Sequence, residues 1–122
     1  MQRGQEIASF IRSSFRSIWS LELLLYLKEH SWRSYTREDL VREMRGSNAI
    51  VEESVSSLLA AGLILEEDDG RLRYSPCSED LSRLVAETEK FYRVKPDAVR
   101  RVIVVGTDNL TAFADAFRIR KD

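Results

Sequence analysis

Residues 36–75 decide the fold of this chain. They read TREDLVREMRG (36–46), SNAIVEESVSSLLAAG (47–62) and LILEEDDGRLRYS (63–75). In the first piece, Thr36 and Asp39 have the spacing of a capping box, with Asp in place of the usual Glu or Gln. Gly46 favours a helix end, because glycine readily takes the left-handed conformation just beyond a helix. This piece therefore predicts a short helix that ends in a tight corner.

The second piece predicts a longer helix with one buried side. Its main apolar residues fall at positions i, i+4, i+7 and i+8, which is one stripe facing a core. They are Val51, Val55, Leu58 and Leu59. Ser47 or Asn48 can cap the first turn of this helix, and Gly62 ends it.

The third piece predicts a β-hairpin. Asp69-Gly70 is a strong signal for a tight type I′ turn, whose two central residues both need positive φ. On the return strand, Leu72 and Tyr74 alternate with arginines, as expected for a strand with one buried face. Pro76 ends that strand.

The order of short helix, tight corner, second helix and hairpin resembles the winged helix-turn-helix superfamily, in the form found among small bacterial regulators of the MarR and ArsR type. The resemblance covers roughly residues 17–75. It implies a mainly α fold with a small β-hairpin wing (α+β) and extra N- and C-terminal helices. It also implies a DNA-binding transcription regulator, with the second helix of the motif in the major groove and the wing beside it.

The rest of the chain is expected to be helical and to form one domain with this motif. We assign residues 1–16 to an N-terminal helix, 17–76 to the winged-helix core and 77–122 to a C-terminal helical extension. Residues 17–30 are so rich in leucine that no broad polar face remains, so we expect their helix to be central and buried on most sides. The run 102–105 suits a strand because it is β-branched, but we predict a helix there.

Two apolar stripes outside the motif are candidates for an oligomer interface. For the N-terminal stripe, packing on its own domain and dimerisation with a second copy are equal alternatives. The resemblance favours a homodimer, since similar regulators often dimerise through helices outside the motif. The residues of the two stripes are Ile7, Phe10, Ile11, Phe15, Leu110, Phe113 and Phe117.

The charge of the chain argues partly against DNA. The net charge is −1, from 19 Lys and Arg against 20 Asp and Glu, whereas nucleic-acid-binding proteins usually carry a basic surplus. Residues 36–75 hold five arginines and nine acidic residues, and five minus nine is −4. DNA affinity comes largely from neutralising phosphates, so this balance is unfavourable for the part that would meet DNA.

If DNA is the ligand, arginines would contact phosphates, and two polar residues would lie near the bases. This candidate set is Arg37, Arg42, Arg45, Asn48, Ser56, Arg71 and Arg73. There is no Arg or Lys between Gly46 and Gly62. The commonest specific base contact, Arg or Lys to guanine, is therefore missing from the expected recognition helix.

The exposed side of that helix predicts an alternative function. Ala49, Glu53 and Ser57 lie opposite its buried stripe, and small side chains let another helix approach closely. The alternative is a winged-helix protein-protein interaction module without DNA binding, which uses this face or the aromatic C-terminal helices. DNA binding ranks first here, because basic residues from the termini or from a partner subunit can supplement the motif. The two functions are distinguished by whether certain arginines converge on one face of the folded dimer, namely Arg33, Arg37, Arg42, Arg45, Arg71 and Arg73.

The sequence contains no glycine-rich phosphate loop, HExxH, paired cysteine motif or nucleophile elbow. We therefore expect no enzyme, no cofactor and no metal site. Cys77 is the only cysteine, which excludes an intramolecular disulfide and suits a reducing cytosol. The longest apolar run, Leu23 to Leu27, is too short to span a bilayer. With no N-terminal export signal, we expect a cytoplasmic protein without membrane contact.

Overall fold

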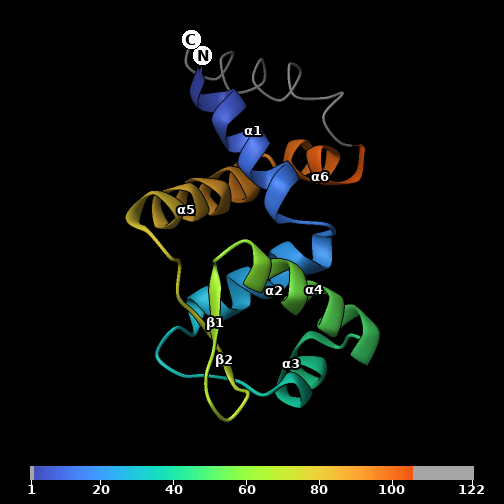
Figure 1. The fold of residues 1–122 in the computed structure, drawn as a ribbon. Coiled ribbons are helices and arrows are strands. Elements are labelled where there is room, and N and C mark those ends of the chain that lie inside the picture. The colour runs from blue at the N-terminus through green and yellow to red at the C-terminus, as the bar shows by residue number, and fades with distance from the viewer. Residues whose placement is uncertain (1, 106–122) are drawn as a thin grey trace.

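The computed structural model describes residues 2–105, which form six helices and one two-stranded antiparallel sheet. The elements are α1 (Gln2–Ser14), α2 (Ile18–Glu29), α3 (Arg37–Met44), α4 (Asn48–Ala60), β1 (Ile64–Glu66), β2 (Leu72–Tyr74), α5 (Glu79–Val94) and α6 (Pro96–Val105). Figure 1 shows two groups: α2, α3, α4 and the hairpin lie below α1, α5 and α6. The predicted mainly α fold with a small hairpin is confirmed. The predicted last helix, with Leu110, Phe113 and Phe117, lies outside the described residues.

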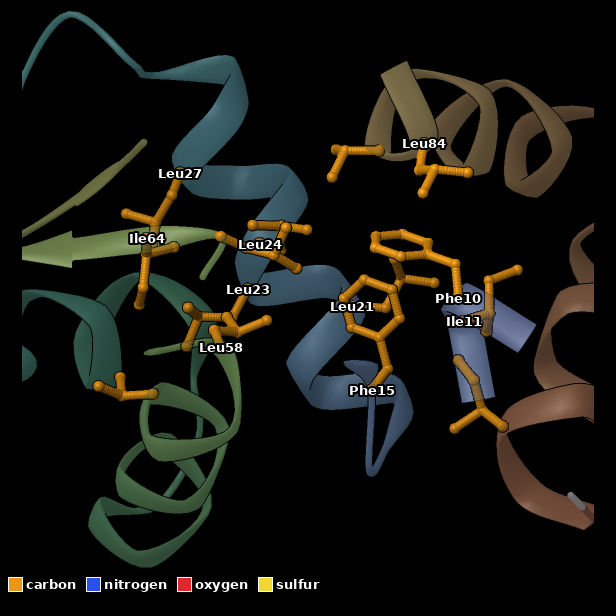
Figure 2. Close-up of a cluster of buried hydrophobic side chains, with 14 of the residues drawn as sticks. Phe10, Ile11, Phe15, Leu21, Leu23, Leu24, Leu27, Leu58, Ile64 and Leu84 are labelled. Carbon is orange, nitrogen blue, oxygen red and sulfur yellow. The ribbon is translucent and has the colours of Figure 1, made fainter. Parts of the chain in front are cut away.

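Helix α2 lies at the centre of the core, as predicted. Its N-cap Ser17 and Ser20 form a capping box that starts the helix. It contacts α4 and β2 on one side and α6 on the other. Figure 2 shows Leu21 beside Phe15, and Leu23 beside Leu58 of α4. The leucines on both sides of α2 are at most 1% exposed, namely Leu21, Leu23, Leu24 and Leu27.

Helix α3 begins with the predicted capping box. The Asp39 N–H donates to Thr36 Oγ1 over 3.0 Å, and the Thr36 N–H donates to Asp39 Oδ2 over 3.1 Å. The end of α3 differs from the prediction, because Arg45 rather than Gly46 takes the left-handed conformation, with φ 57°. Gly46 lies against the Trp19 ring, since a Cβ there would be 3.4 Å from the nearest ring atom. Ser47 is the N-cap of α4.

The hairpin is confirmed, but its turn is wider than predicted. β1 pairs antiparallel with β2 in the register Ile64 to Tyr74 and Glu66 to Leu72. Gly70 has φ 88°, whereas Asp69 does not have positive φ, so the turn is not type I′. The Gly70 N–H donates to the Glu67 carbonyl, which places the turn over residues 67–70. Tyr35 adds a short bridge to Leu72 on the other edge of β2.

The apolar stripe of α1 and the residue after it belongs to the core of the same chain. Ile7, Phe10, Ile11 and Phe15 are between 0% and 7% exposed. α1 packs against α5 and α6, and α6 extends through residues 102–105, which confirms the predicted helix there. Of the two alternatives for the stripe, the structure shows packing within the chain. A second copy could reach these side chains only if the core opened.

Phe15→Ala tests whether this stripe stabilises the core. We expect the free energy of unfolding to fall by about 3–5 kcal/mol, because a buried ring is replaced by a cavity. The loss should be the same at all protein concentrations in chemical denaturation. Val104→Ala is the control, because Val104 is 73% exposed, and it should change the free energy by less than about 0.5 kcal/mol. A small loss accompanied by dissociation of an oligomer in light scattering would instead indicate an intermolecular interface.

Candidate functional site

The exposed side of α4 is the candidate site. We define the α4 face as Ala49, Glu53, Ser56 and Ala60, which are all exposed and recur along one side of the helix. The opposite side is buried through Val51, Val55 and Leu58. The face therefore carries three small side chains and one carboxylate.

The sequence-based description of this face is wrong at Ser57. That side chain is half-buried and its Oγ donates to the Ser14 carbonyl over 3.1 Å. Ser57 thus satisfies a carbonyl at the end of α1, where helices leave backbone acceptors unpaired. No local signal predicts this bond, because the two residues are 43 positions apart. Ala60 and Ser56 complete the face in its place.

Arg37 joins three elements beside the α4 face. Its Nε donates to Glu52 Oε1 over 2.8 Å, and its Nη1 donates to Glu66 Oε2 over 3.1 Å. Nη1 also lies 3.4 Å from the Gly70 carbonyl oxygen. The hydrogen bond with Glu66 is the largest cause that raises the pKa of Arg37, ahead of the bond with Glu52. This guanidinium therefore ties α3 to α4 and to the hairpin and is not free for a phosphate.

Three more of the predicted phosphate contacts also have carboxylate partners. The pairs are Arg42 with Asp39 (2.7 Å), Arg71 with Asp69 (3.4 Å) and Arg73 with Glu67 (3.4 Å). Arg33 instead lies over the ring of Tyr35, 4.2 Å from its centroid. The structure thus distributes these arginines among acids rather than gathering them into a basic surface.

The remaining candidates for DNA contact are exposed. Arg45 follows α3, Asn48 begins α4 and Ser56 lies on the α4 face. Within residues 2–105, Arg45 makes no ion pair. One free arginine is a small electrostatic contribution compared with the several phosphates that a DNA-binding protein neutralises.

The surface of α4 and the hairpin is negative overall. Its acids are Glu52, Glu53, Glu66, Glu67, Asp68 and Asp69, and the arginines among or against them are Arg37, Arg71 and Arg73. Three minus six is −3. Glu53 has no ion-pair partner in the described part of the chain, so its carboxylate stands alone among the small residues of the α4 face.

A second feature is a shallow groove between α2 and the end of α3. It is lined by Ile18, Trp19, Glu22 and Met44 and has a volume of about 350 Å³. The Tyr92 hydroxyl of α5 donates to Glu22 Oε2 over 2.5 Å. No local sequence pattern predicts this hydrogen bond beside the groove, because it joins residues 70 positions apart.

The described residues offer no metal centre. No group of three or more His, Cys, Asp or Glu side chains in this part of the structure lies close enough to hold an ion. His30 Nδ1 is instead 2.9 Å from the Tyr26 carbonyl oxygen at the end of α2. Among the helices within residues 2–105, none has the length and apolar character needed to cross a membrane.

Comparison with known proteins adds no relative. No protein-family model matches the chain, and neither a curated protein nor a solved structure matches it.

The capping box that positions α3 predicts a pH dependence. The Thr36 backbone N–H holds the pKa of Asp39 below its usual 3.8, with help from the Thr36 hydroxyl and Arg42. A lowered pKa stabilises the fold above the unfolded value, and this contribution is lost as the pH falls through the folded value. Asp39→Asn should therefore lower the free energy of unfolding at neutral pH.

The difference between Asp39→Asn and the wild type should shrink as the pH falls from neutral through the lowered pKa of Asp39, because below that pKa both forms are uncharged at this position. Chemical denaturation over that pH range measures it. Asp68→Asn is the control, because Asp68 is exposed in the hairpin turn and should show little difference at any pH. A constant difference for Asp39→Asn would show that its charge is not the cause.

Proposed function

We propose that the chain is a winged-helix protein-protein interaction module that binds a partner through the α4 face. The winged-helix interpretation rests on the order α2, α3, α4, β1 and β2, with the bridge at Tyr35 as a third short strand. The observation that carries the function is the internal pairing of the arginines. Arg37, Arg42, Arg71 and Arg73 already contact carboxylates of their own chain.

The α4 face suits a helix of another protein. Alanine and serine let helix axes approach closely, because packed helices are separated by about 8–10 Å according to the side chains at the contact. Small side chains also lose little conformational entropy on binding. The unpaired carboxylate of Glu53 selects a partner with Lys or Arg opposite it, and the surrounding negative charge favours the encounter. The partner chemistry is therefore a basic helix.

We propose the cytoplasm as the compartment of this module. Cys77 is a free and exposed thiol, a state that the reducing cytosol maintains.

Site-specific photo-crosslinking in the cells that express the chain tests this function. A photoreactive amino acid at Ala49 or Ser56 should give a discrete adduct with a protein partner. Ser82 and Ala86 are matched control positions, because they are exposed on α5, and they should give no such adduct. Glu53→Arg should reduce the yield of the adduct by about tenfold or more, because the attraction between Glu53 and a basic residue of the partner is replaced by a repulsion between like charges. Equal adducts from both surfaces would contradict the proposal.

A DNA-binding transcription regulator is the second candidate. It is favoured by Arg45, Asn48 and Ser56, which are exposed on or next to α4 in the order of elements typical of DNA-binding winged helices. A homodimer would double these contacts and offset the unfavourable charge. Elution as a monomer in chromatography with light scattering would oppose that form of the hypothesis.

Fluorescence anisotropy with a random-sequence duplex separates the two functions. We expect the interaction module to show no saturable binding even at low salt. A DNA-binding protein would bind at low salt, with log K falling linearly against log salt and a slope of about −0.9 for each phosphate contacted. In that case Arg45→Ala should reduce the slope by about one. Such a slope would overturn the interaction proposal in favour of DNA.

A further inference from the structure

The groove between α2 and α3 is separate from the α4 face. Its Trp19 ring lies beside Gly46, and Gly46 in turn lies beside Val51, a buried residue on the core side of α4. Ile18, Trp19 and Met44 are half-buried, so the groove is open to solvent and its walls are mainly apolar. A volume of about 350 Å³ is near the lower end of the range for small-molecule sites, which is about 300–1,000 Å³.

The polar group of the groove is an oriented carboxylate. Glu22 is exposed and accepts the hydroxyl hydrogen bond of Tyr92 at 2.5 Å. Burial is the main cause that raises the pKa of Tyr92, and the hydrogen bond to Glu22 is the second. The Tyr92 hydroxyl therefore keeps its proton and acts as the donor. Across residues 2–105, Glu22 has no ion-pair partner. Arg100 lies over the Tyr92 ring, 5.6 Å from its centroid, and pairs with Asp97. Tyr92 therefore orients the carboxylate without cancelling its charge.

We propose that this groove binds a small hydrophobic amine, with the ammonium group on Glu22 and the apolar body against Trp19, Ile18 and Met44. A cation close to an indole face gains a cation–π contribution, and the methionine thioether adapts to an apolar or aromatic body. A neutral ligand would cover Glu22 without supplying a partner for its charge, which is unfavourable. A carboxylate ligand would be repelled. This inference is independent of the partner of the α4 face.

Intrinsic fluorescence tests the proposal directly. Trp32→Phe leaves Trp19 as the only tryptophan of the chain, and Trp32 is 72% exposed, so its replacement should not disturb the fold. The probes are 2-phenylethylamine, 2-phenylethanol and 3-phenylpropanoate, which share an aromatic body and differ in charge. We expect a saturable change with the amine, at least tenfold weaker affinity for the alcohol and no saturation with the carboxylate. No saturation with the amine, or equal affinity for all three, would overturn the proposal.

Two variants in the Trp32→Phe background test whether Glu22 binds the ammonium group and whether Tyr92 orients the Glu22 carboxylate. Glu22→Gln should weaken amine affinity about tenfold or more, and Tyr92→Phe should weaken it severalfold because the carboxylate loses its positioning donor. Glu29→Gln is the matched control, since Glu29 is an exposed glutamate on the same helix, and it should not change the affinity. Circular dichroism checks that each variant is folded. Unchanged amine affinity in folded Glu22→Gln would exclude Glu22 as the ammonium site.

Discussion

The burial of α2 on both sides is the constraint on which the rest of the structure depends. Its leucines pack on one side against α4 and the hairpin and on the other side against the group formed by α1, α5 and α6. One helix therefore joins the two groups of elements. Each buried leucine side chain contributes about 1.5–3 kcal/mol relative to exposure. The leucine-rich part of this helix therefore cannot also present a binding face. The exposed and functional surfaces are consequently left to α4, to the hairpin and to the exposed N-terminal part of α2 at Glu22.

The same arrangement sets the electrostatics of the surface formed by α3, α4 and the hairpin. Arg37 begins α3 and reaches Glu52 and Glu66, so it draws α3, α4 and the hairpin together. Exposed ion pairs of this kind contribute about 0–1 kcal/mol each. Their larger effect concerns binding, because a guanidinium held by two carboxylates is already satisfied. In the sequence the arginines of this surface suggest contact with DNA. Their carboxylate partners in the structure instead favour the proposed binding of a protein. Glu53 remains as the unpaired charge of the α4 face.

The two proposed sites place different demands on the fold. The α4 face is a convex surface of small side chains, which suits another helix and offers no enclosed volume. The groove at Trp19 is concave and mainly apolar, with one carboxylate oriented from α5. It requires α2, α3 and α5 to meet, and it lies on the core side of the α3–α4 corner. The first site depends on one helix, whereas the second depends on how the two groups of helices pack.

The sequence by itself determined the features that depend on local spacing. The capping box at Thr36, the apolar stripe of α4 and the hairpin follow from hydrogen bonds and periodicity within a few residues. Tertiary structure alone decided the partners of Arg37, the inward turn of Ser57 and the bond from Tyr92 to Glu22. It also buried the α1 stripe within the chain and placed the left-handed residue at Arg45 rather than at Gly46. The three sets of hydrogen bonds join groups from 15 to 70 positions apart along the chain, which a local pattern does not contain.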